Sequence, residues 1–334
     1  MKPLNVLVTG GAGYIGSHTH WRLVEAGHKV TVLDNLYSGH RWAVHPQAEF
    51  VLGNAGDIAL VRSILRERNI QAVVHFAGHI VVPESIEDPL KYFENNTCVS
   101  QRLVTACIAE KVSRFVFSST AAVYGEPRVL PVGEDLPPAP VNPYGASKLM
   151  TEWMLRDVGN SAPGFRYICL RYFNAAGARP DGRLGQATPK ATHLIKVACE
   201  AAVGSRGHVS IFGTDYQTPD GTCVRDYVHV EDLAQAHLDA LKYLEGGGAS
   251  GCFNCGYGKG YSVRQVLETV QNVSERRLDV REAARRPGDP ETLVADAARI
   301  QRVIGWKPRY DNLDDICRSA YRWELSAAER LRGG

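Results

Sequence analysis

Short apolar runs alternate with longer, mixed segments along the first half of the chain. The runs lie at Val6–Val8, Val30–Leu33, Phe50–Leu52, Ala72–Phe76, Phe115–Phe117 and Ile168–Leu170. Continuous apolar runs of this kind are typical of strands buried on both faces, and most of the intervening segments are long enough to form helices. The alternation predicts an α/β fold built on a doubly wound parallel sheet.

The second half of the chain lacks this regular alternation. After about Phe173, Gly and Pro become frequent, and an apolar, helical pattern returns only at Val228–Leu244. We expect a Rossmann-type dinucleotide-binding domain in residues 1–174, to which residues 217–245 return, and a smaller α/β substrate domain in residues 175–334. The tail from Arg322 to Gly334 predicts a final helix.

The composition is that of an ordinary globular enzyme and argues against several classes of protein. The 334 residues carry a formal net charge of only +2, so no broad basic surface is expected for nucleic acid. The longest apolar stretches, such as Gln71 to Val82, contain His75 and His79 and fall short of the ~20 residues that span a bilayer. Met1 runs into a strand-like segment without a signal peptide. We therefore expect a cytoplasmic protein that binds neither nucleic acid nor membrane.

The cysteines predict neither a metal site nor a disulfide framework. Cys252 and Cys255 form a Cys-x-x-Cys pair, but neither a second such pair nor a nearby His pair completes a metal set. The segment between them also resembles a short buried strand. We interpret all eight as reduced structural residues: Cys98, Cys107, Cys169, Cys199, Cys223, Cys252, Cys255 and Cys317.

A glycine-rich turn follows the first predicted strand. Gly10, Gly13 and Gly16 are spaced as Gly-x-x-Gly-x-x-Gly, and a helix is expected from about Tyr14 to Ala26. Such a turn lets backbone approach a pyrophosphate, and the helix N-terminus offers unpaired N–H groups to it. Asp34 ends the second strand, 18 residues after Gly16. A carboxylate there accepts from a ribose 2′-hydroxyl and repels a 2′-phosphate, so the sequence predicts NAD and not NADP.

Two further segments carry candidate chemistry. Tyr144 and Lys148 are four residues apart, on a helix that can begin near Pro143 with Asn142 as its cap. They share one helix face, where an ammonium can lower the pKa of the phenol and make it a general base. Thr120 follows the fifth predicted strand, at the edge of the sheet where ligands bind, and its hydroxyl could bridge Tyr144 and a substrate.

The chain resembles the nucleotide-sugar epimerases of the extended short-chain dehydrogenase/reductase family over nearly its whole length. The segments that carry the resemblance are Val8–His18, His75–Gly78, Asn95–Asn96, Leu170–Asn174, Ile211–Tyr216, Asp220–Val230 and Arg285–Asp289. The resemblance implies an NAD-dependent inversion of C4 in UDP-galactose or UDP-glucose, through a transient 4-keto sugar. It also implies a homodimer formed through helices near Leu90–Ile108 and Tyr144–Val158.

The resemblance also assigns roles to individual residues. Thr120, Tyr144 and Lys148 would be catalytic. The cofactor would contact these three together with Gly10, Gly13, Tyr14, Ile15, Gly16, Asp34, Asn35, Asn54, Phe76, Ala77, Gly78, Asn95 and Tyr172. The UDP-sugar would contact Asn174, His193, Leu194, Phe212, Arg225, Tyr227, Arg286, Asp289 and Leu293, with the two arginines clamping the diphosphate.

At four positions, the residue in this chain affects whether the family's role for that position applies here. Asn54 replaces an Asp that accepts from the adenine amino group, and Ile80 stands where some members have a Lys near the cofactor phosphates. His193 replaces an Asn beside the diphosphate. Leu293 occupies a position that gates the sugar pocket in the family, or it packs against the second domain.

Several other activities remain as alternatives. A 4-epimerase could prefer UDP-xylose and UDP-arabinose, or UDP-N-acetylhexosamines. A nucleotide-sugar dehydratase usually carries acidic residues directly after the Thr, where this chain has Ala121 and Ala122. A simple dehydrogenase would not need the paired arginines. A non-catalytic NAD-sensing protein usually loses the Tyr or the Lys, and both are present here.

Overall fold

A seven-stranded sheet forms the centre of the computed structural model, which describes residues 2–189, 191–286 and 288–330. Its strand order is β10-β6-β5-β4-β1-β2-β3, and every neighbouring pair is parallel. The strands are β1 (Asn5–Thr9), β2 (Lys29–Asp34), β3 (Glu49–Leu52), β4 (Ala72–His75), β5 (Arg114–Thr120), β6 (Arg166–Tyr172) and β10 (Gly251–Cys255). The order reverses between β1 and β4, which is where doubly wound sheets bind ligands, at the carboxyl ends of the strands.

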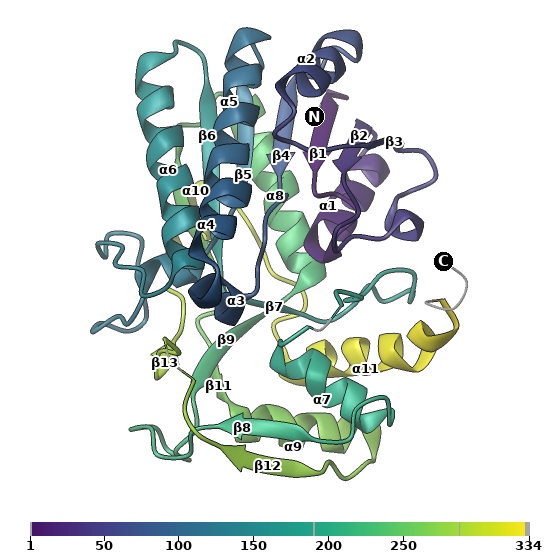
Figure 1. Cartoon of the computed structure of the whole chain (residues 1–334), viewed down its shortest axis with the longest axis vertical. Helices are drawn as coiled ribbons and strands as arrows, with labels where there is room; N and C mark the ends of the chain where they lie inside the picture. Colours follow the sequence, from purple (N-terminus) through teal and green to yellow (C-terminus); the bar gives the residue numbers. More distant parts are fainter. Residues whose placement is uncertain (1, 190, 287, 331–334) are drawn as a thin grey trace.

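Helices cover both faces of this sheet (Figure 1). One face carries α1 (Tyr14–Glu25) and α8 (Val230–Glu245), and the other carries α2 (Ile58–Glu67), α5 (Val99–Ala109) and α6 (Pro143–Ser161). Shorter elements are α3 (Val82–Glu87), α4 (Pro89–Tyr92), a π-helical turn at Phe93–Cys98 and α10 (Ala298–Val303). The predicted doubly wound α/β fold is confirmed.

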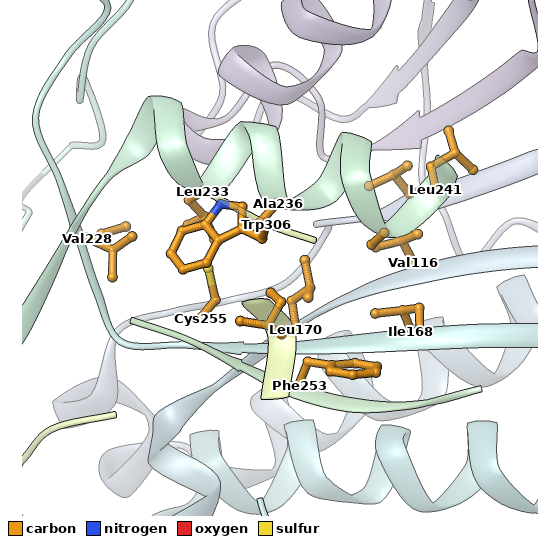
Figure 2. Close-up of a cluster of buried hydrophobic side chains, with 14 of the residues drawn as sticks. Val116, Ile168, Leu170, Val228, Leu233, Ala236, Leu241, Phe253, Cys255 and Trp306 are labelled. Atoms are coloured by element: carbon orange, nitrogen blue, oxygen red, sulfur yellow. The ribbon is translucent and has the colours of Figure 1, made fainter. Parts of the chain in front are cut away.

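The larger core lies between the sheet and α8. Figure 2 shows Leu233, Ala236 and Leu241 of α8 facing Val116, Ile168, Leu170 and Phe253 of the strands. Trp306 fills one end of this layer beside Cys255, fully buried, and its indole N–H donates to the carbonyl oxygen of Asp232 over 2.9 Å. A buried indole needs such a partner.

A second, smaller unit lies beyond the carboxyl ends of the main sheet (Figure 1). Its strands are β7 (Asn174–Ala176), β8 (Val209–Phe212), β9 (Val224–His229), β11 (Gly260–Ser262), β12 (Val280–Ala283) and β13 (Thr292–Leu293). Its helices are α7 (Leu194–Ala202), α9 (Val263–Ser274) and α11 (Leu313–Arg330), which share an apolar core. Strand β9 pairs with β7, β11 and β13 and so connects the pieces of this unit.

The chain crosses between the two units more than once. Helix α8 returns to the main sheet within the expected range 217–245, and β10 then adds the last strand beside β6. The division of the chain near residue 174 into a dinucleotide domain and a substrate domain remains a proposal.

The element boundaries agree with the sequence patterns except at the end of the chain. Each of the six apolar runs lies within or overlaps a strand, and α1 ends at Glu25 before Gly27, whose φ of +87° ends the helix. The final helix was expected from Arg322, but α11 already begins at Leu313. Its amphipathic face packs against α7 and α9, which the tail sequence alone does not indicate. Residues 331–334 of the predicted helix lie outside the described residues.

The Cys-x-x-Cys pair lies within β10, and its two side chains contribute to different cores. Cys255 packs under α8, whereas Cys252 packs on the opposite face of the sheet, in register with Cys169 of β6. Alternation along a strand separates two residues spaced in this way. All eight cysteines are free thiols.

Candidate active site

The glycine-rich turn has the tight geometry that a pyrophosphate requires. Gly10 has a φ of +68°, and a Cβ there would lie 2.5 Å from the backbone nitrogen of Ala77. A Cβ on Gly16 would lie 2.3 Å from the carbonyl oxygen of Gly10, so α1 packs directly on the turn. Gly13 caps α1 without a side-chain hydrogen bond, which leaves N–H groups of the first turn available to an anion.

Asp34 is held at the end of β2 by backbone donors. Its two carboxylate oxygens accept from the N–H of Ala12 over 2.9 Å and from that of Leu36 over 2.8 Å. Burial raises the pKa of Asp34 above its ordinary value, while these two hydrogen bonds lower it. Each oxygen has a further lone pair, so the carboxylate can accept from a ribose hydroxyl in a fixed position.

These groups border a cleft of about 1100 Å³ at the carboxyl ends of β1, β2, β4 and β5. Every residue predicted to contact the cofactor lines this cleft except Thr120: Gly10, Gly13, Tyr14, Ile15, Gly16, Asp34, Asn35, Asn54, Phe76, Ala77, Gly78, Asn95, Tyr144, Lys148 and Tyr172. The glycine turn, the fixed carboxylate and the size of the cleft fit a dinucleotide.

The π-helical turn explains how Asn95 reaches the cleft. Asn96 is buried and bonds both the N–H and the carbonyl of His79, and its amide also donates to Ser147 over 3.0 Å. The wider turn Phe93–Cys98 thereby fixes Asn96 between β4 and α6 and directs its neighbour Asn95 into the cleft. Turns of this type often occur at functional sites.

Helix α6 places Tyr144 and Lys148 on the cleft floor. It begins at Pro143, as predicted, and Asn142 accepts from the N–H of Gly145 over 2.8 Å. A Cβ on Gly145 would lie 2.6 Å from the carbonyl oxygen of Ala122, so the helix start packs closely on the turn after β5. The first turn of the helix therefore lies next to Thr120.

Lys148 is buried among polar and aromatic groups of β5. Its ammonium donates to the carbonyl oxygen of Ser118 over 3.0 Å and lies 5.0 Å from the centroid of the Phe117 ring. The side chain is 3% exposed, and burial lowers its pKa from 10.5 to about 8. Among the residues that the structure describes, no carboxylate forms an ion pair with it, so its charge is available to a neighbouring phenol.

Tyr144 and Thr120 interact directly. Burial raises the pKa of Tyr144 above its ordinary value, and a hydrogen bond with the side chain of Thr120 lowers it. The Thr120 hydroxyl also accepts from the N–H of Ala122 over 3.1 Å, which fixes its orientation. Tyr172 lies beyond, hydrogen-bonded to the hydroxyl of Ser118. The structure thus brings the three predicted catalytic side chains together.

A second cavity of about 380 Å³ adjoins the cleft, and both are lined by Ala175, Gln186 and His193. Four of the predicted substrate residues line it: Asn174, His193, Leu194 and Tyr227. Burial lowers the pKa of His193, and its ring shares a hydrogen bond of 2.8 Å with the side-chain amide of Gln186. His193 can still offer one ring nitrogen to a ligand.

The other predicted substrate residues form a cluster on the second unit, outside the walls of both cavities. Arg225 pairs with Asp289 at 3.3 Å, and the guanidinium of Arg286 lies 3.6 Å from the centroid of the Phe212 ring. Burial lowers the pKa of Arg286. Arg225 lies two residues before Tyr227 on β9, so the strand connects this cluster to the smaller cavity.

The positions that depart from the family pattern have distinct environments. Asn54 lines the cleft, but its side-chain oxygen already accepts from the N–H of Gly56 over 2.7 Å. Ile80 also lines the cleft and is 40% exposed. Leu293 lies beside Arg225 in β13, and its side chain is 7% exposed and packs in the larger core. That packing supports a structural role and leaves the gating role untested.

Several residues that line the cleft were not predicted. Ser118 holds both Lys148 and Tyr172, and its place at the end of β5 could have indicated it. Two loop segments, Tyr37–Gly39 and the part around Gln186 and Thr188, form the remaining wall. They contain neither a motif nor a hydrophobic period that the sequence analysis could use.

The described residues contain neither a metal-ligand cluster nor a membrane-spanning helix. Within the described ranges, no cluster of three or more His, Cys, Asp or Glu side chains is arranged to hold a metal ion. Each described helix is too short or too polar to traverse a lipid bilayer.

Sequence comparison places the chain in a family. The NAD dependent epimerase/dehydratase family matches residues 6–256, which include both the glycine turn and the Tyr144–Lys148 helix. The chain belongs to this family. Its matched region covers the seven-stranded sheet of the fold.

Members of this family and solved structures similar to the chain cover almost all of it. A UDP-glucose 4-epimerase of Azospirillum brasilense is 56% identical over 98% of this chain and 93% of its own length. The crystal structure of UDP-glucose 4-epimerase from Brucella ovis in complex with NAD is 44% identical, with a TM-score of 0.92 over 95% of this chain and 97% of that one. The UDP-Glc/GlcNAc 4-epimerase of Campylobacter jejuni is 47% identical, with a TM-score of 0.85 over 96% and 99%.

Proposed function

We propose that the protein is an NAD-dependent 4-epimerase that interconverts UDP-galactose and UDP-glucose. The observation that carries this proposal is the meeting of Tyr144, Thr120 and Lys148 beside a dinucleotide cleft, with a second cavity adjoining it. A hydroxyl-bearing carbon whose C–H is not acidic can be inverted without net oxidation if a base takes and returns the hydroxyl proton within reach of a retained redox cofactor. NAD, held along the glycine turn and by Asp34, would supply a reversible hydride acceptor for C4.

Tyr144 is the proposed base toward the C4 hydroxyl. In the ligand-free protein its pKa is raised by burial, so it needs help to ionise near neutral pH. The hydrogen bond with Thr120 favours the phenolate. We propose that the positive charge of Lys148, one turn along the helix, adds to this effect. After the sugar has turned, the protonated Tyr144 returns the proton to the oxygen at C4.

The second unit holds the nucleotide while the sugar turns. Arg225 and Arg286 supply guanidinium groups for the diphosphate, and the first turn of α7 after His193 adds N–H groups. When the diphosphate is fixed, the 4-keto sugar can still rotate about the bonds that join it to the diphosphate. The anchor therefore keeps the intermediate from dissociating while it exposes its other face.

The test is incubation of the purified protein with UDP-galactose carrying deuterium at C4, with NAD added but no reductant. We expect UDP-glucose that keeps the deuterium at C4, because the hydride returns to the same carbon. A 4-keto-6-deoxy product would indicate a dehydratase, and accumulating NADH would indicate a dehydrogenase. Binding of NAD without turnover of any UDP-sugar would favour a sensing protein.

Selectivity among UDP-sugars gives a prediction at Leu293. The Campylobacter jejuni structural neighbour is described as a UDP-Glc/GlcNAc 4-epimerase, and a Leu is smaller than the Tyr that goes with plain hexoses in the family. If Leu293 borders the sugar, UDP-N-acetylgalactosamine should react slowly, and Leu293→Tyr should suppress that reaction and leave UDP-galactose turnover largely unchanged. A change of this size in a pocket shifts selectivity by about 1–3 kcal/mol. Competition between the two substrates measures it, and unchanged selectivity in a folded variant would make Leu293 a packing residue only.

Cofactor choice gives a prediction at Asp34. The carboxylate is fixed by the N–H groups of Ala12 and Leu36, so a 2′-phosphate beside it would meet a charge that cannot move away. We expect NAD to displace NADP in competition, and Asp34→Ser to narrow the difference between their dissociation constants. Equal or tighter binding of NADP by the parent protein would contradict this role.

Anchoring of the nucleotide gives a prediction at the arginines. We expect Arg225→Ala and Arg286→Ala to weaken inhibition by UDP, because the loss of one charge-assisted hydrogen bond costs roughly 1.5–3 kcal/mol. Arg281→Ala is a matched control, since Arg281 pairs with Asp279 on the solvent side of β12 and is 61% exposed. UDP inhibition that is the same in all three variants and the parent would place the anchor elsewhere.

We also propose that two copies associate through α4 and α6. The side chains of Leu90 and Trp153 are 77% and 48% exposed, and Ile86 and Met150 extend the same apolar surface. Exposed apolar patches of this kind mark protein interfaces. Light scattering should give twice the chain mass for the parent protein and one chain mass for Trp153→Glu. A parent protein of one chain mass would contradict the proposal.

A further inference from the structure

One wall of the dinucleotide cleft is formed by a segment that belongs to neither predicted motif. We call Leu184–Thr188 the cofactor strap; it lies in the connection between β7 and α7. Gln186 and Thr188 of the strap line the cleft, as do Tyr37, Ser38 and Gly39 in the loop after β2. The strap and this loop are far apart in sequence and border the same cavity.

The strap is bonded to the first unit through His40. The ring of His40 shares a hydrogen bond of 3.0 Å with the carbonyl oxygen of Ala187, in the middle of the strap. The backbone N–H of His40 donates to the carbonyl oxygen of Ala12, in the glycine turn, over 2.9 Å. His40 therefore joins the turn that borders the pyrophosphate site to the strap across the cleft.

The strap is packed against the second unit through Trp323 of α11. The indole N–H donates to the carbonyl oxygen of Gln186 over 3.2 Å, and a Cβ on Gly185 would lie 2.3 Å from the indole ring. Only a glycine at that position lets the strap lie flat on the ring. The start of the strap is fixed as well, because Leu184 is buried in an apolar cluster with Trp21 and Ala43.

A stack of three aromatic rings connects these two attachments. His40 stacks on Trp42 with centroids 5.4 Å apart, and Trp42 stacks on Trp323 at 5.7 Å. His40 and Trp42 come from the first unit, and Trp323 comes from the C-terminal helix of the second. The stack thus fastens the strap to both units at once, and neither unit can move away from the other there without breaking it.

We infer that the cofactor strap is a gate for NAD, held shut by His40, Trp42 and Trp323. The strap and the loop Tyr37–Gly39 border the cleft together and are joined through His40, so we expect a dinucleotide to enter and leave only when the strap lifts. Such a gate slows release without adding a contact to the cofactor. The inference rests on NAD as the cofactor and does not depend on which sugar is epimerised.

The test is the exchange of bound NAD. The protein is loaded with radiolabelled NAD, freed of excess by desalting and chased with unlabelled NAD, and the retained label is counted with time. We expect His40→Ala and Trp42→Leu each to speed release by about tenfold, the change that the loss of one hydrogen bond or of one aromatic stacking pair commonly makes. Association should speed up as well, so that the dissociation constant changes less than either rate.

Two kinds of control keep the test specific. Trp42→Phe keeps a ring in the stack and should restore slow exchange, which loss of folding would not predict. His208→Ala removes an exposed imidazole near β8 and should exchange like the parent. Exchange at the parent rate in both His40→Ala and Trp42→Leu would overturn the inference, and so would faster release with unchanged association, since a gate controls both directions.

Discussion

Replacement of Tyr144 by Phe should lower kcat by about 10²–10⁴-fold, the usual effect of losing a general acid–base group. The variant removes one oxygen from a side chain that lies against Thr120 on the floor of the cleft. Because Phe keeps the ring, the helix start and the cleft should keep their shape. Binding of NAD and of UDP should therefore change little.

The Tyr144→Phe result needs a matched comparison. Tyr261→Phe makes the same chemical change in β11, away from the cleft, and should keep full turnover. Single-turnover measurements with each variant separate the chemical step from release of the product. Near-normal turnover in a folded Tyr144→Phe protein would remove Tyr144 from the mechanism.

Replacement of Lys148 by Met should reduce turnover as strongly and should also change its pH dependence. Without the ammonium, ionisation of Tyr144 requires a higher pH, so the rise of kcat with pH should move to more alkaline values than in the parent. A profile of kcat from pH 6 to 10 for both proteins measures the displacement. Equal midpoints in the two profiles would mean that Lys148 does not act on the tyrosine.

Lys148→Met should stabilise the ligand-free protein, although it lowers turnover. The pKa of Lys148 falls from 10.5 to about 8 on folding, so between these values the unfolded chain binds more protons and stability rises with pH. Burial of the ammonium therefore destabilises the fold in full below about pH 8. Lys148→Met should raise Tm at pH 7, with a gain that fades toward pH 10.5. A loss of stability at pH 7 would contradict this sign.

Most of the main sheet could be predicted because its signals are local. Six of its seven strands overlap a predicted apolar run, and some helices begin after a capping side chain, such as Asn142 before α6. What the sequence did not reveal depends on partners that are distant in the chain. The segment around Cys252 resembled a strand, but nothing nearby indicates that it pairs with β6.

The candidate site also contains residues that local motifs predict and residues that only long-range contacts bring into place. The glycine turn, Asp34 and the Tyr144 helix carry spacing that reflects their chemistry, and the structure gathers them around one cleft. Gln186 and Thr188 reach the same cleft only because Trp323 and His40 hold their loop in place. Such long-range contacts produce no periodic pattern in the sequence. Leu293 is a similar case, because the sequence alone could not decide whether it lines a pocket or packs in the core.

The late arrival of β10 sets a condition on how the chain folds as it leaves the ribosome. Strand β6 ends at Tyr172, and its outer neighbour begins only at Gly251. At roughly 5–20 residues per second, synthesis leaves the backbone edge of β6 unpaired for several seconds. An unpaired apolar edge strand invites pairing with other chains. Ribosome pausing between these two strands would prolong that exposure, so codon choice in this stretch should influence how much of the protein aggregates during expression.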